Sequence, residues 1–271
     1  MPELGEVEVV RRNLVRWWEG RRASKVRLRD ESLLKNSDAG RLETALTRRL
    51  ETAERRGKYL MCHLAGDRTA VFHFRMTGKI IRCDDPEREY ARLSWYVDET
   101  GWLSFVDQRR LGTAHLMTAD ELASYEPLVE MGPEPEDLTV TRLRGSCTGR
   151  RLLKTALLDQ AIVAGVGNIA ISELFWRLEI RPDVRCGELS DRQLGRLIEE
   201  MPRYFEEVVE FSMADEIEYL QEGGADNPFA IYGRDGAPCP RCQTALAKTR
   251  VGGRSSFYCP VCQGEDDLAS Q

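Results

Sequence analysis

The chain contains 271 residues, 42% of them apolar, and its 39 basic and 45 acidic side chains leave a formal net charge of −6 and a pI near 5.4. These values favour a soluble globular protein of about two domains. No stretch approaches the roughly 20 apolar residues of a membrane span, and the charged N-terminus lacks the apolar run of a signal peptide. We therefore expect no membrane partner and a cytoplasmic location.

The acidic net charge argues at first against a nucleic-acid partner, because affinity for phosphate backbones comes largely from Lys and Arg. The charges are unevenly distributed, however, since residues 119–137 hold seven acidic side chains and no basic one. The basic residues are concentrated in other segments: Arg11–Arg29, Arg48–Lys58, Arg75–Arg82, Arg109–Arg110, Arg142–Lys154 and Arg234–Arg254. This segregation is compatible with one basic face on an acidic body, or with ordinary solvated surface.

The first 125 residues read as a mostly β domain that begins with a helix. Apolar residues from Leu4 to Trp18 recur at helical spacing, and the pattern stops at Gly20. A second helix is predicted over 42–50. Strands are predicted over 25–30, between the two helices, and then over 58–64, 69–75, 79–83, 93–97 and 102–106, the last two as a hairpin.

Prolines at 127, 133 and 135 indicate a linker, after which the pattern becomes helical. Helices are predicted over 152–163 and 169–178, with a sharp turn at Gly165 and Gly167 between them. Asn168 would cap the second of these helices, whose N-terminus suits a phosphate. Ser190 and Gln193 form a capping-box pattern at the start of a further helix, which Pro202 kinks or splits.

Two cysteine pairs near the C-terminus are the strongest motif in the chain. They are separated by sixteen residues and consist of Cys239, Cys242, Cys259 and Cys262. This C-x2-C…C-x2-C spacing predicts one tetrahedral Zn²⁺, which is structural because four sulfur ligands leave no open position. The other cysteines, Cys62, Cys83, Cys147 and Cys186, are scattered singly, so we expect a reducing compartment rather than a disulfide framework.

The N-terminus carries a second candidate site. If Met1 is removed, which the small Pro2 permits, the chain begins with a secondary amine beside the carboxyl group of Glu3. A free amine can attack a sugar aldehyde, and a neighbouring carboxyl can move the protons. The alternative is that Pro2 merely starts a helix, since proline suits the first helical position.

The chain resembles the formamidopyrimidine-DNA glycosylase/endonuclease VIII family over almost its whole length. The similar segments occur in the family's order and precede or include the cysteine pairs: Met1–Glu6, Arg56–Leu60, His73–Gly78, Asp107–Gly112, Leu158–Gln160 with Gly165–Asn168, Ile231–Gly236 and Arg254–Cys259. The resemblance implies an α+β multi-domain fold. Its parts would be an N-terminal β-sandwich with flanking helices (1–125), a helix–two-turns–helix domain (126–225), a zinc-finger hairpin (226–263) and a disordered tail (264–271).

The resemblance also implies roles for individual residues. Pro2 would attack C1′ of a damaged nucleotide in double-stranded DNA, with Glu3 as proton donor and acceptor and Glu6 positioning the reaction. Lys58 and Arg254 correspond to basic residues implicated in the eliminations that follow. Met76, Arg109 and Leu111 match residues that fill the space left by the flipped nucleotide. Further DNA contacts would come from Tyr90, Arg150 and Asn168, and the protein would act as a monomer.

Several residues depart from the family pattern and leave the substrate open. Gly5 replaces a usual proline, Arg75 a usual glycine, and Leu111 stands where purine-lesion enzymes commonly have phenylalanine; the segment 212–230 is also short. The leading hypothesis is excision of oxidised purines such as 8-oxoguanine and formamidopyrimidines. The alternatives are the same chemistry on oxidised pyrimidines, a non-catalytic protein that binds damaged DNA, and an RNA-binding zinc ribbon.

Overall fold

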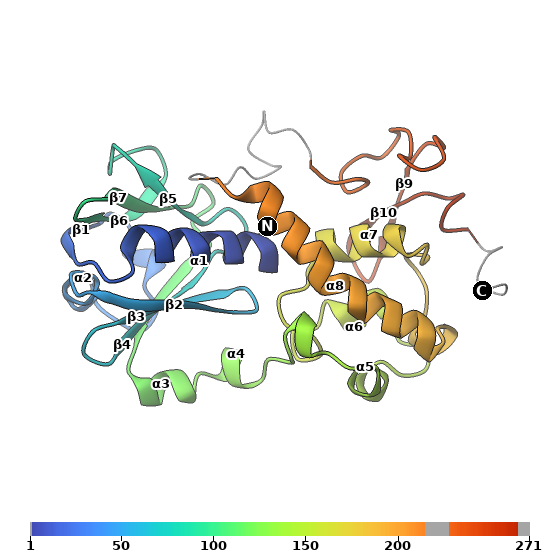
Figure 1. Ribbon diagram of the computed structural model, residues 1–271, viewed down its shortest axis with the longest axis horizontal. Helices are drawn as coiled ribbons and strands as arrows, with labels where there is room; N and C mark the ends of the chain where they lie inside the picture. Colours follow the sequence, from blue (N-terminus) through green and yellow to red (C-terminus); the bar gives the residue numbers. More distant parts are fainter. Residues whose placement is uncertain (1, 215–227, 265–271) are drawn as a thin grey trace. The chain divides into compact units, whose positions relative to one another are not determined.

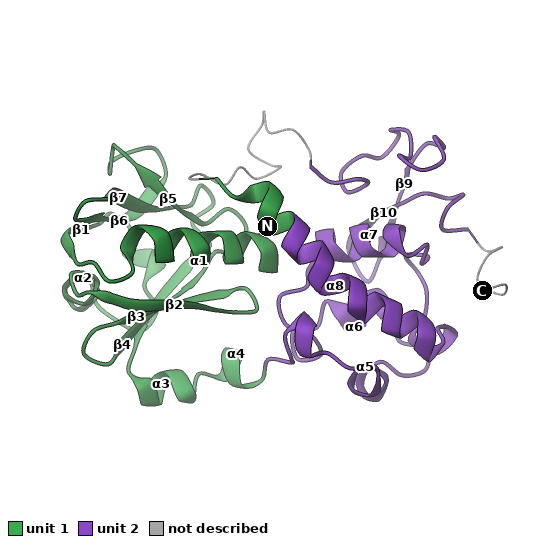
Figure 2. Ribbon diagram, viewed as in Figure 1, with its two compact units in different colours: residues 1–130, 208–223 green, residues 131–207, 224–271 purple. Residues whose placement is uncertain are grey.

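The computed structural model describes residues 2–214 and 228–264 (Figure 1). Its residue contacts divide the chain into two compact units, residues 1–130 with 208–223 and residues 131–207 with 224–271 (Figure 2). In these described ranges, none of the helices combines the length and apolar character needed to cross a membrane.

Unit 1 is built around two four-stranded antiparallel sheets. The first sheet has the order β1 (Ala23–Leu28), β6 (Ala91–Val97), β7 (Gly101–Val106), β5 (Lys79–Cys83). The second has the order β2 (Leu50–Arg56), β3 (Tyr59–Leu64), β4 (Arg68–His73), β8 (Thr113–Met117). The expected β-sandwich with flanking helices is confirmed, and β6 and β7 form the predicted hairpin.

Helix α1 (Leu4–Trp18) contacts strands of both sheets and contributes a full row of buried apolar side chains to their core (Figure 1). Trp18 at its end packs against Trp95 with ring centroids 5.4 Å apart, and Phe72 stacks on Trp95 at 6.4 Å. The Phe105 ring in turn stacks on Phe72, with the ring centroids 5.9 Å apart. This chain of aromatic rings ties the helix to both sheets, because aromatic pairs add specific geometry to a large buried area.

The remaining elements of unit 1 are η1 (Glu31–Leu33), α2 (Ala39–Leu46), α3 (Ala119–Ala123) and α4 (Glu126–Val129). The second helix was predicted too late in the chain: Asp38 caps α2 by accepting a hydrogen bond from the Arg41 N–H, and Leu50 already belongs to β2. Strand β2 escaped the sequence analysis because only Leu50 and Ala53 are buried in it, so its alternation is weak.

Unit 2 contains η2 (Pro135–Asp137), α5 (Val140–Ser146), α6 (Leu153–Leu157), α7 (Asn168–Arg177), η3 (Cys186–Glu188) and most of α8 (Asp191–Ser212). The predicted capping box is present: Ser190 N–H donates to Gln193 at 2.8 Å, and Gln193 N–H donates to Ser190 at 3.3 Å. Pro202 lies inside α8, which continues through it.

Helix α6 is shorter than the predicted 152–163 because a polar side chain closes a turn after it. The Gln160 amide accepts a hydrogen bond from Gly165 N–H at 2.9 Å and donates to the Val166 carbonyl at 3.0 Å. These bonds compete with continuation of the helix. The last elements are β9 (Ala247–Val251) and β10 (Arg254–Tyr258), an antiparallel hairpin whose two-residue turn has positive φ at Gly252 and Gly253.

Cys147 and Cys186 correct one expectation about the cysteines. The structure joins them in a disulfide between the end of α5 and the start of η3, with the two Cα atoms 5.4 Å apart. Their separation of 39 residues gave no signal in the sequence, since pairing of scattered cysteines depends on the fold that brings them together.

We predict that this disulfide stabilises the protein measurably. Closing a loop of this length typically contributes about 2–4 kcal/mol to the free energy of unfolding. Denaturant unfolding should therefore shift to lower denaturant when a phosphine reductant is added to the wild-type protein. A Cys147→Ala/Cys186→Ala variant should unfold identically with and without reductant, and alkylation of both thiols in the untreated wild-type protein would contradict the assignment.

Candidate active site and metal centre

The start of α1 gathers the first candidate site in unit 1. Pro2 and Glu3 are buried, and Glu3, which is 3% exposed, is the N-cap residue of the helix. The backbone N–H of Glu3 donates to the Glu6 carboxylate at 2.9 Å. Both carboxyl groups therefore lie on the turn that carries Pro2. Met1, and hence its removal, lies outside the described residues.

Glu6 holds its proton more tightly than an ordinary glutamate. Burial raises the pKa of Glu6, and the negative charge of Glu3 raises this pKa further. A buried carboxyl group with a raised pKa is suited to proton transfer. The sequence alone indicated both glutamates, but not the burial that raises the pKa of Glu6.

Lys58 lies in the turn between β2 and β3, after Gly57 with its positive φ of 54°. Its charge acts on His73 at the end of β4: burial, followed by the charges of Arg75 and Lys58, lowers the pKa of His73 to about 3. His73 is therefore neutral at physiological pH. Its Nδ1 accepts a hydrogen bond from the Arg75 N–H at 3.1 Å, so the proton resides on Nε2.

Asp107 organises the loop that carries Arg109 and Leu111. This 1% exposed carboxylate accepts hydrogen bonds from the backbone N–H groups of Leu111 at 2.8 Å and Gly112 at 2.7 Å through Oδ2. Its Oδ1 accepts from the Arg109 N–H at 3.2 Å and from the Thr77 hydroxyl. The loop backbone is thus fixed, while the side chains of Arg109 and Leu111 remain exposed, Leu111 to 44%.

The same network includes the segment around Met76. The Thr77 hydroxyl accepts a hydrogen bond from the Arg109 N–H at 3.1 Å, which places the half-buried Met76 beside the Arg109 loop. Tyr90 is 38% exposed, and its carbonyl accepts from the Asp107 N–H at 3.0 Å. The structure therefore brings together the void-filling candidates Met76, Arg109 and Leu111 with Tyr90.

Arg110, unlike Arg109, forms an ion pair with a residue that the structure describes. It has a positive φ of 56°, and its guanidinium donates to Asp30 from Nε at 2.7 Å and from Nη2 at 3.0 Å. The hydrogen bonds from Arg110 and, to a lesser extent, Ser32 together lower the pKa of Asp30 to about 2 against the effect of burial. This bidentate pair ties the exposed Arg110 side chain to Asp30.

In unit 2, Asn168 and the hairpin are joined to each other. The Asn168 side-chain amide donates to the Ser255 carbonyl at 3.0 Å, and its Oδ1 is buried without a hydrogen-bond partner among the described atoms. The N-cap of α7 is Gly167 rather than Asn168, which corrects our expectation: Asn168 is the first helical residue, and its side chain is directed to the hairpin. Arg254 begins β10 and is exposed just after the turn.

Arg150 lies in an exposed turn between α5 and α6. Its carbonyl accepts a hydrogen bond from Arg185 at 2.9 Å, and the neighbouring Arg151 carbonyl accepts from the Cys186 N–H at 2.9 Å. The disulfide at Cys147 and Cys186 secures the base of this turn. The backbone that presents Arg150 is therefore held from both sides.

The four C-terminal cysteines converge as predicted. Their Sγ atoms all lie within 4.8 Å of one another, with Cys239 and Cys262 3.9 Å apart and Cys242 and Cys259 3.4 Å apart. A tetrahedral zinc with Zn–S bonds of about 2.3 Å requires sulfur atoms about 3.8 Å apart. Hydrogen bonds from Thr244 lower the pKa of Cys242 to about 6, so the donor set and its spacing both fit Zn²⁺.

Three buried charged side chains that sequence reasoning did not single out hold these sites in place: Asp107, Lys154 and Glu173. Lys154 donates to the Ser255 carbonyl at 2.9 Å and to the Ser256 hydroxyl at 2.5 Å, next to Arg254. A charge within an otherwise apolar helical run, as at Lys154 and Glu173, could have indicated a buried partner, because such charges are rarely buried unpaired.

Glu173 on α7 anchors the chain that leads into the metal centre. Its carboxylate accepts hydrogen bonds from three consecutive backbone N–H groups, those of Ala230 at 2.9 Å, Ile231 at 3.0 Å and Tyr232 at 2.9 Å. One turn later, the Trp176 indole N–H donates to Cys239 Sγ at 3.4 Å. Helix α7 therefore holds both the approach to the cysteine cluster and one of its sulfur atoms.

Comparison with known proteins agrees with this arrangement along the chain. Residues 1–114 match the formamidopyrimidine-DNA glycosylase N-terminal domain, 131–216 its H2TH domain, and 236–264 the zinc finger found in FPG and IleRS. The formamidopyrimidine-DNA glycosylase of Pelotomaculum thermopropionicum is 33% identical over 97% of this chain and 99% of its own length. The chain belongs to the formamidopyrimidine-DNA glycosylase family. It is a DNA glycosylase of base-excision repair, with one structural zinc in its finger.

Solved structures give the same result for the fold. A complex of Lactococcus lactis FPG with DNA containing Fapy-dG has a TM-score of 0.84 and 28% identity, covering 97% of this chain and 100% of that one. A second complex of the L. lactis protein, with DNA containing an oxidised pyrimidine, has a TM-score of 0.83 and 29% identity at the same coverage. The two units and the zinc hairpin are therefore those of this family.

The Asp30–Arg110 pair gives this glycosylase a predictable acid sensitivity. Because the folded pKa of Asp30 lies below its usual value of 3.8, the pair contributes stability above about pH 4 and loses it as the pH falls towards about 2. We predict that Asp30→Asn lowers the free energy of unfolding at pH 5 and that the difference from wild type shrinks by pH 2.5. Denaturant unfolding at both pH values measures this.

The control for this prediction is Asp84→Asn, which changes an exposed aspartate of the same unit. Its difference from wild type should be small at both pH values. A constant deficit of Asp30→Asn across the range would contradict a role for ionised Asp30.

Proposed function

We propose that this glycosylase excises oxidised bases from double-stranded DNA and then cleaves the backbone, with Pro2 as the nucleophile. The observation that carries the proposal is the buried position of Pro2, directly before the N-cap residue Glu3 of α1, whose backbone N–H is bonded to the Glu6 carboxylate. Once Met1 is removed, the Pro2 nitrogen is a secondary amine, which forms an iminium adduct with an aldehyde-level carbon.

The proposed reaction begins at C1′ of the damaged nucleotide. The Pro2 nitrogen forms a bond to C1′, and the base leaves with the electrons of the glycosidic bond and a proton. Glu3 transfers protons between the amine, the sugar and the leaving base, and Glu6, which accepts a hydrogen bond from the Glu3 backbone N–H, keeps Glu3 in place. Ring opening then yields an iminium ion between Pro2 and C1′.

The iminium ion makes the C2′ protons acidic, so loss of one proton expels the 3′ phosphate, and a second elimination expels the 5′ phosphate. We assign Lys58 and Arg254 to these phosphates, because cationic groups stabilise the charge that develops on the leaving oxygen. His73, neutral and flanked by Lys58 and Arg75, is a further phosphate donor through Nε2. Asn168 and Arg150 are assigned to the backbone of the same DNA.

To expose C1′, the nucleotide must leave the duplex and the gap must be filled. The side chains of Met76, Arg109 and Leu111 are assigned to this task, with Arg109 facing the orphaned base and Tyr90 beside the loop. The support is the hydrogen-bond network of Asp107, which fixes the backbone and leaves the side chains outward. A fixed loop pays less ordering entropy when it enters DNA.

We propose oxidised purines as the first substrates and oxidised pyrimidines as the alternative. The L. lactis relative has been crystallised with DNA containing Fapy-dG and with DNA containing an oxidised pyrimidine, so the fold accommodates both classes. Leu111, which stands where purine-lesion enzymes commonly have phenylalanine, favours oxidised pyrimidines as substrates. The segment 212–230, used for the same argument, lies mostly outside the described residues, as do residues 265–271 of the expected disordered tail.

Further proposals concern the domains, the oligomeric state and the location of the protein. We propose that residues 1–125, 126–225 and 226–263 act as catalytic, helix–two-turns–helix and zinc-finger domains. We also propose that the protein works as a monomer on the bacterial nucleoid in the cytoplasm, since DNA carrying its substrates is found there. The RNA-binding alternative loses its basis, because the zinc finger accounts for only residues 236–264 of a chain that matches the family throughout.

The test is a base-release assay on duplexes that carry 8-oxoguanine, an oxidised pyrimidine or an abasic site. We predict that the wild-type protein releases 8-oxoguanine and cleaves the strand. Glu3→Gln should lower the rate of base release by about 10²–10⁴-fold, the usual contribution of a general acid or base. Glu19→Gln, at the other end of the same helix, is the control and should retain the wild-type rate.

Two outcomes would contradict the proposal. Equal base release by Glu3→Gln and wild type would remove Glu3 from the proton transfers. Tight lesion binding without base release or strand cleavage would favour the non-catalytic damaged-DNA-binding protein.

A further inference from the structure

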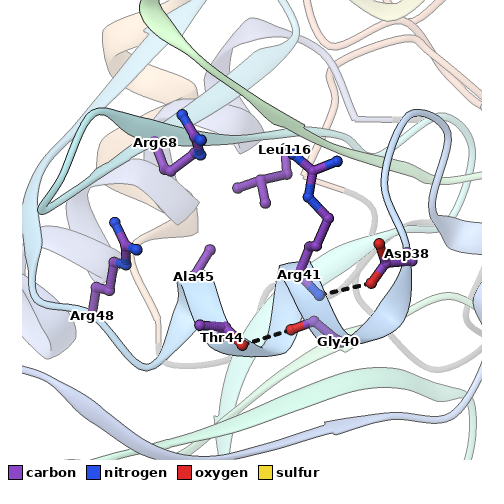
Figure 3. A pocket seen from close by; sticks show the side chains of 8 residues that line it. All are labelled: Asp38, Gly40, Arg41, Thr44, Ala45, Arg48, Arg68 and Leu116. Atoms are coloured by element: carbon purple, nitrogen blue, oxygen red, sulfur yellow. Dashed lines mark hydrogen bonds between the residues drawn. The ribbon is translucent and has the colours of Figure 1, made fainter.

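A pocket of about 490 Å³ lies in unit 1 beside α2, and none of the residues assigned above to DNA lines it (Figure 3). One wall is formed by Arg41 and Ala45 on α2 with Arg48 just after it, and the other by Arg68 at the start of β4 and Leu116 on β8. Figure 3 shows the three arginine side chains arranged around the same space. The volume falls within the range of small-molecule sites, about 300–1,000 Å³.

Among the described residues, the three guanidinium groups have no carboxylate partner. Arg48 donates to the carbonyls of Ala65 at 3.0 Å and Gly66 at 3.2 Å, and Arg68 to the carbonyl of Asp67 at 3.1 Å. Within residues 2–214 and 228–264, no ion pair involves Arg41, Arg48 or Arg68. Each guanidinium therefore retains N–H donors for another acceptor.

The nearest acidic groups are engaged elsewhere. Asp38 lines the pocket, but its Oδ1 accepts from the Arg41 backbone N–H at 2.9 Å as the cap of α2. Glu121 on α3 accepts from the Thr118 N–H at 2.8 Å, and this backbone hydrogen bond lowers the pKa of Glu121 before the more distant charges of Arg68 and Arg41 add to the effect.

Some other arginines of unit 1 are paired with carboxylates. Glu8 forms ion pairs with three arginines, Arg11, Arg12 and Arg55, and Asp30 forms an ion pair with Arg110. In a chain whose 45 acidic residues outnumber its 39 basic ones, carboxylates are available to pair with surface arginines. Three like charges left around one concavity repel one another, and an anion between them would remove this repulsion.

We propose that this pocket binds a multiply charged phosphate compound of the size of a nucleoside diphosphate. The planar fork of a guanidinium matches phosphate oxygens in a bidentate manner, so Arg41, Arg48 and Arg68 together suit more than one phosphate. A single phosphate would leave most of the volume unused, whereas Ala45 and Leu116 provide an apolar wall for the remainder of a nucleotide.

Calorimetric titration of the full-length, zinc-containing protein with pyrophosphate, ADP and AMP tests the proposal. We expect pyrophosphate or ADP to bind with a Kd below about 1 mM, and AMP to bind at least tenfold more weakly, about the contribution of one lost charged pair. Arg41→Gln and Arg68→Gln should each raise the Kd by about tenfold or more. Arg49→Gln is the matched control, because Arg49 neighbours Arg48 but pairs with Glu51 at 3.7 Å.

The DNA-binding residues supply a second control. Arg254→Gln should leave the Kd for ADP unchanged, and Arg41→Gln should leave base release from lesion-containing duplexes unchanged. Binding of pyrophosphate and ADP alike assigns the site to the phosphates, and preferential binding of ADP assigns it to a nucleotide; both support the proposal. No binding at millimolar ligand, equal loss in Arg49→Gln, or loss confined to Arg254→Gln would overturn it.

Discussion

The burial of helix α1 against the β-sandwich is the constraint on which the active site depends. Trp18 packs on Trp95 at the C-terminal end of the helix. The buried side chains between Val7 and Trp17 fix the rotation of α1 about its axis and its position along that axis. A helix held along its whole length has a defined first turn. Glu3 and Glu6 lie at that turn and Pro2 directly precedes it, so the placement of the proposed nucleophile and carboxyl groups follows from apolar packing some distance away. This packing orders the start of the chain, which is usually the most mobile part of a protein.

Buried carboxylates and one buried lysine extend this order to the loops. Asp107 fixes the backbone from Arg109 to Gly112, and a side chain at Gly112 would collide with Phe105, with the nearest ring carbon 2.6 Å from an added Cβ. In unit 2, Glu173 and Lys154 perform the corresponding task for the zinc hairpin. Each of these groups is fully hydrogen-bonded to backbone or neighbouring side chains, which offsets the cost of burying a charge. The four cysteines would leave a bound zinc no open coordination position, so the metal has a structural role.

The sequence was most informative where chemistry requires particular residues at fixed spacing. The cysteine pairs predicted the metal centre, and the segments from Met1 to Cys259 indicated the family, the β-sandwich and the zinc finger. It was least informative where long-range contacts decide the structure. Strand β2 has too few buried residues to show alternation, α6 is ended by hydrogen bonds of the Gln160 side chain, and Asn168 is directed to a hairpin 87 residues away. The pairing of Cys147 with Cys186, and the convergence of Arg41, Arg48 and Arg68, likewise become visible only once the chain is folded.

The central claim is that Pro2 is the nucleophile, and the most direct measurement is mass spectrometry of the protein trapped by borohydride on lesion-containing DNA. The account predicts a chain that starts at Pro2, with the reduced sugar attached to its nitrogen. The adduct should be absent in Pro2→Gly or form there only through the primary amine of the new terminus. A trapped sugar on a lysine side chain, or full activity in protein that retains Met1, would contradict the account.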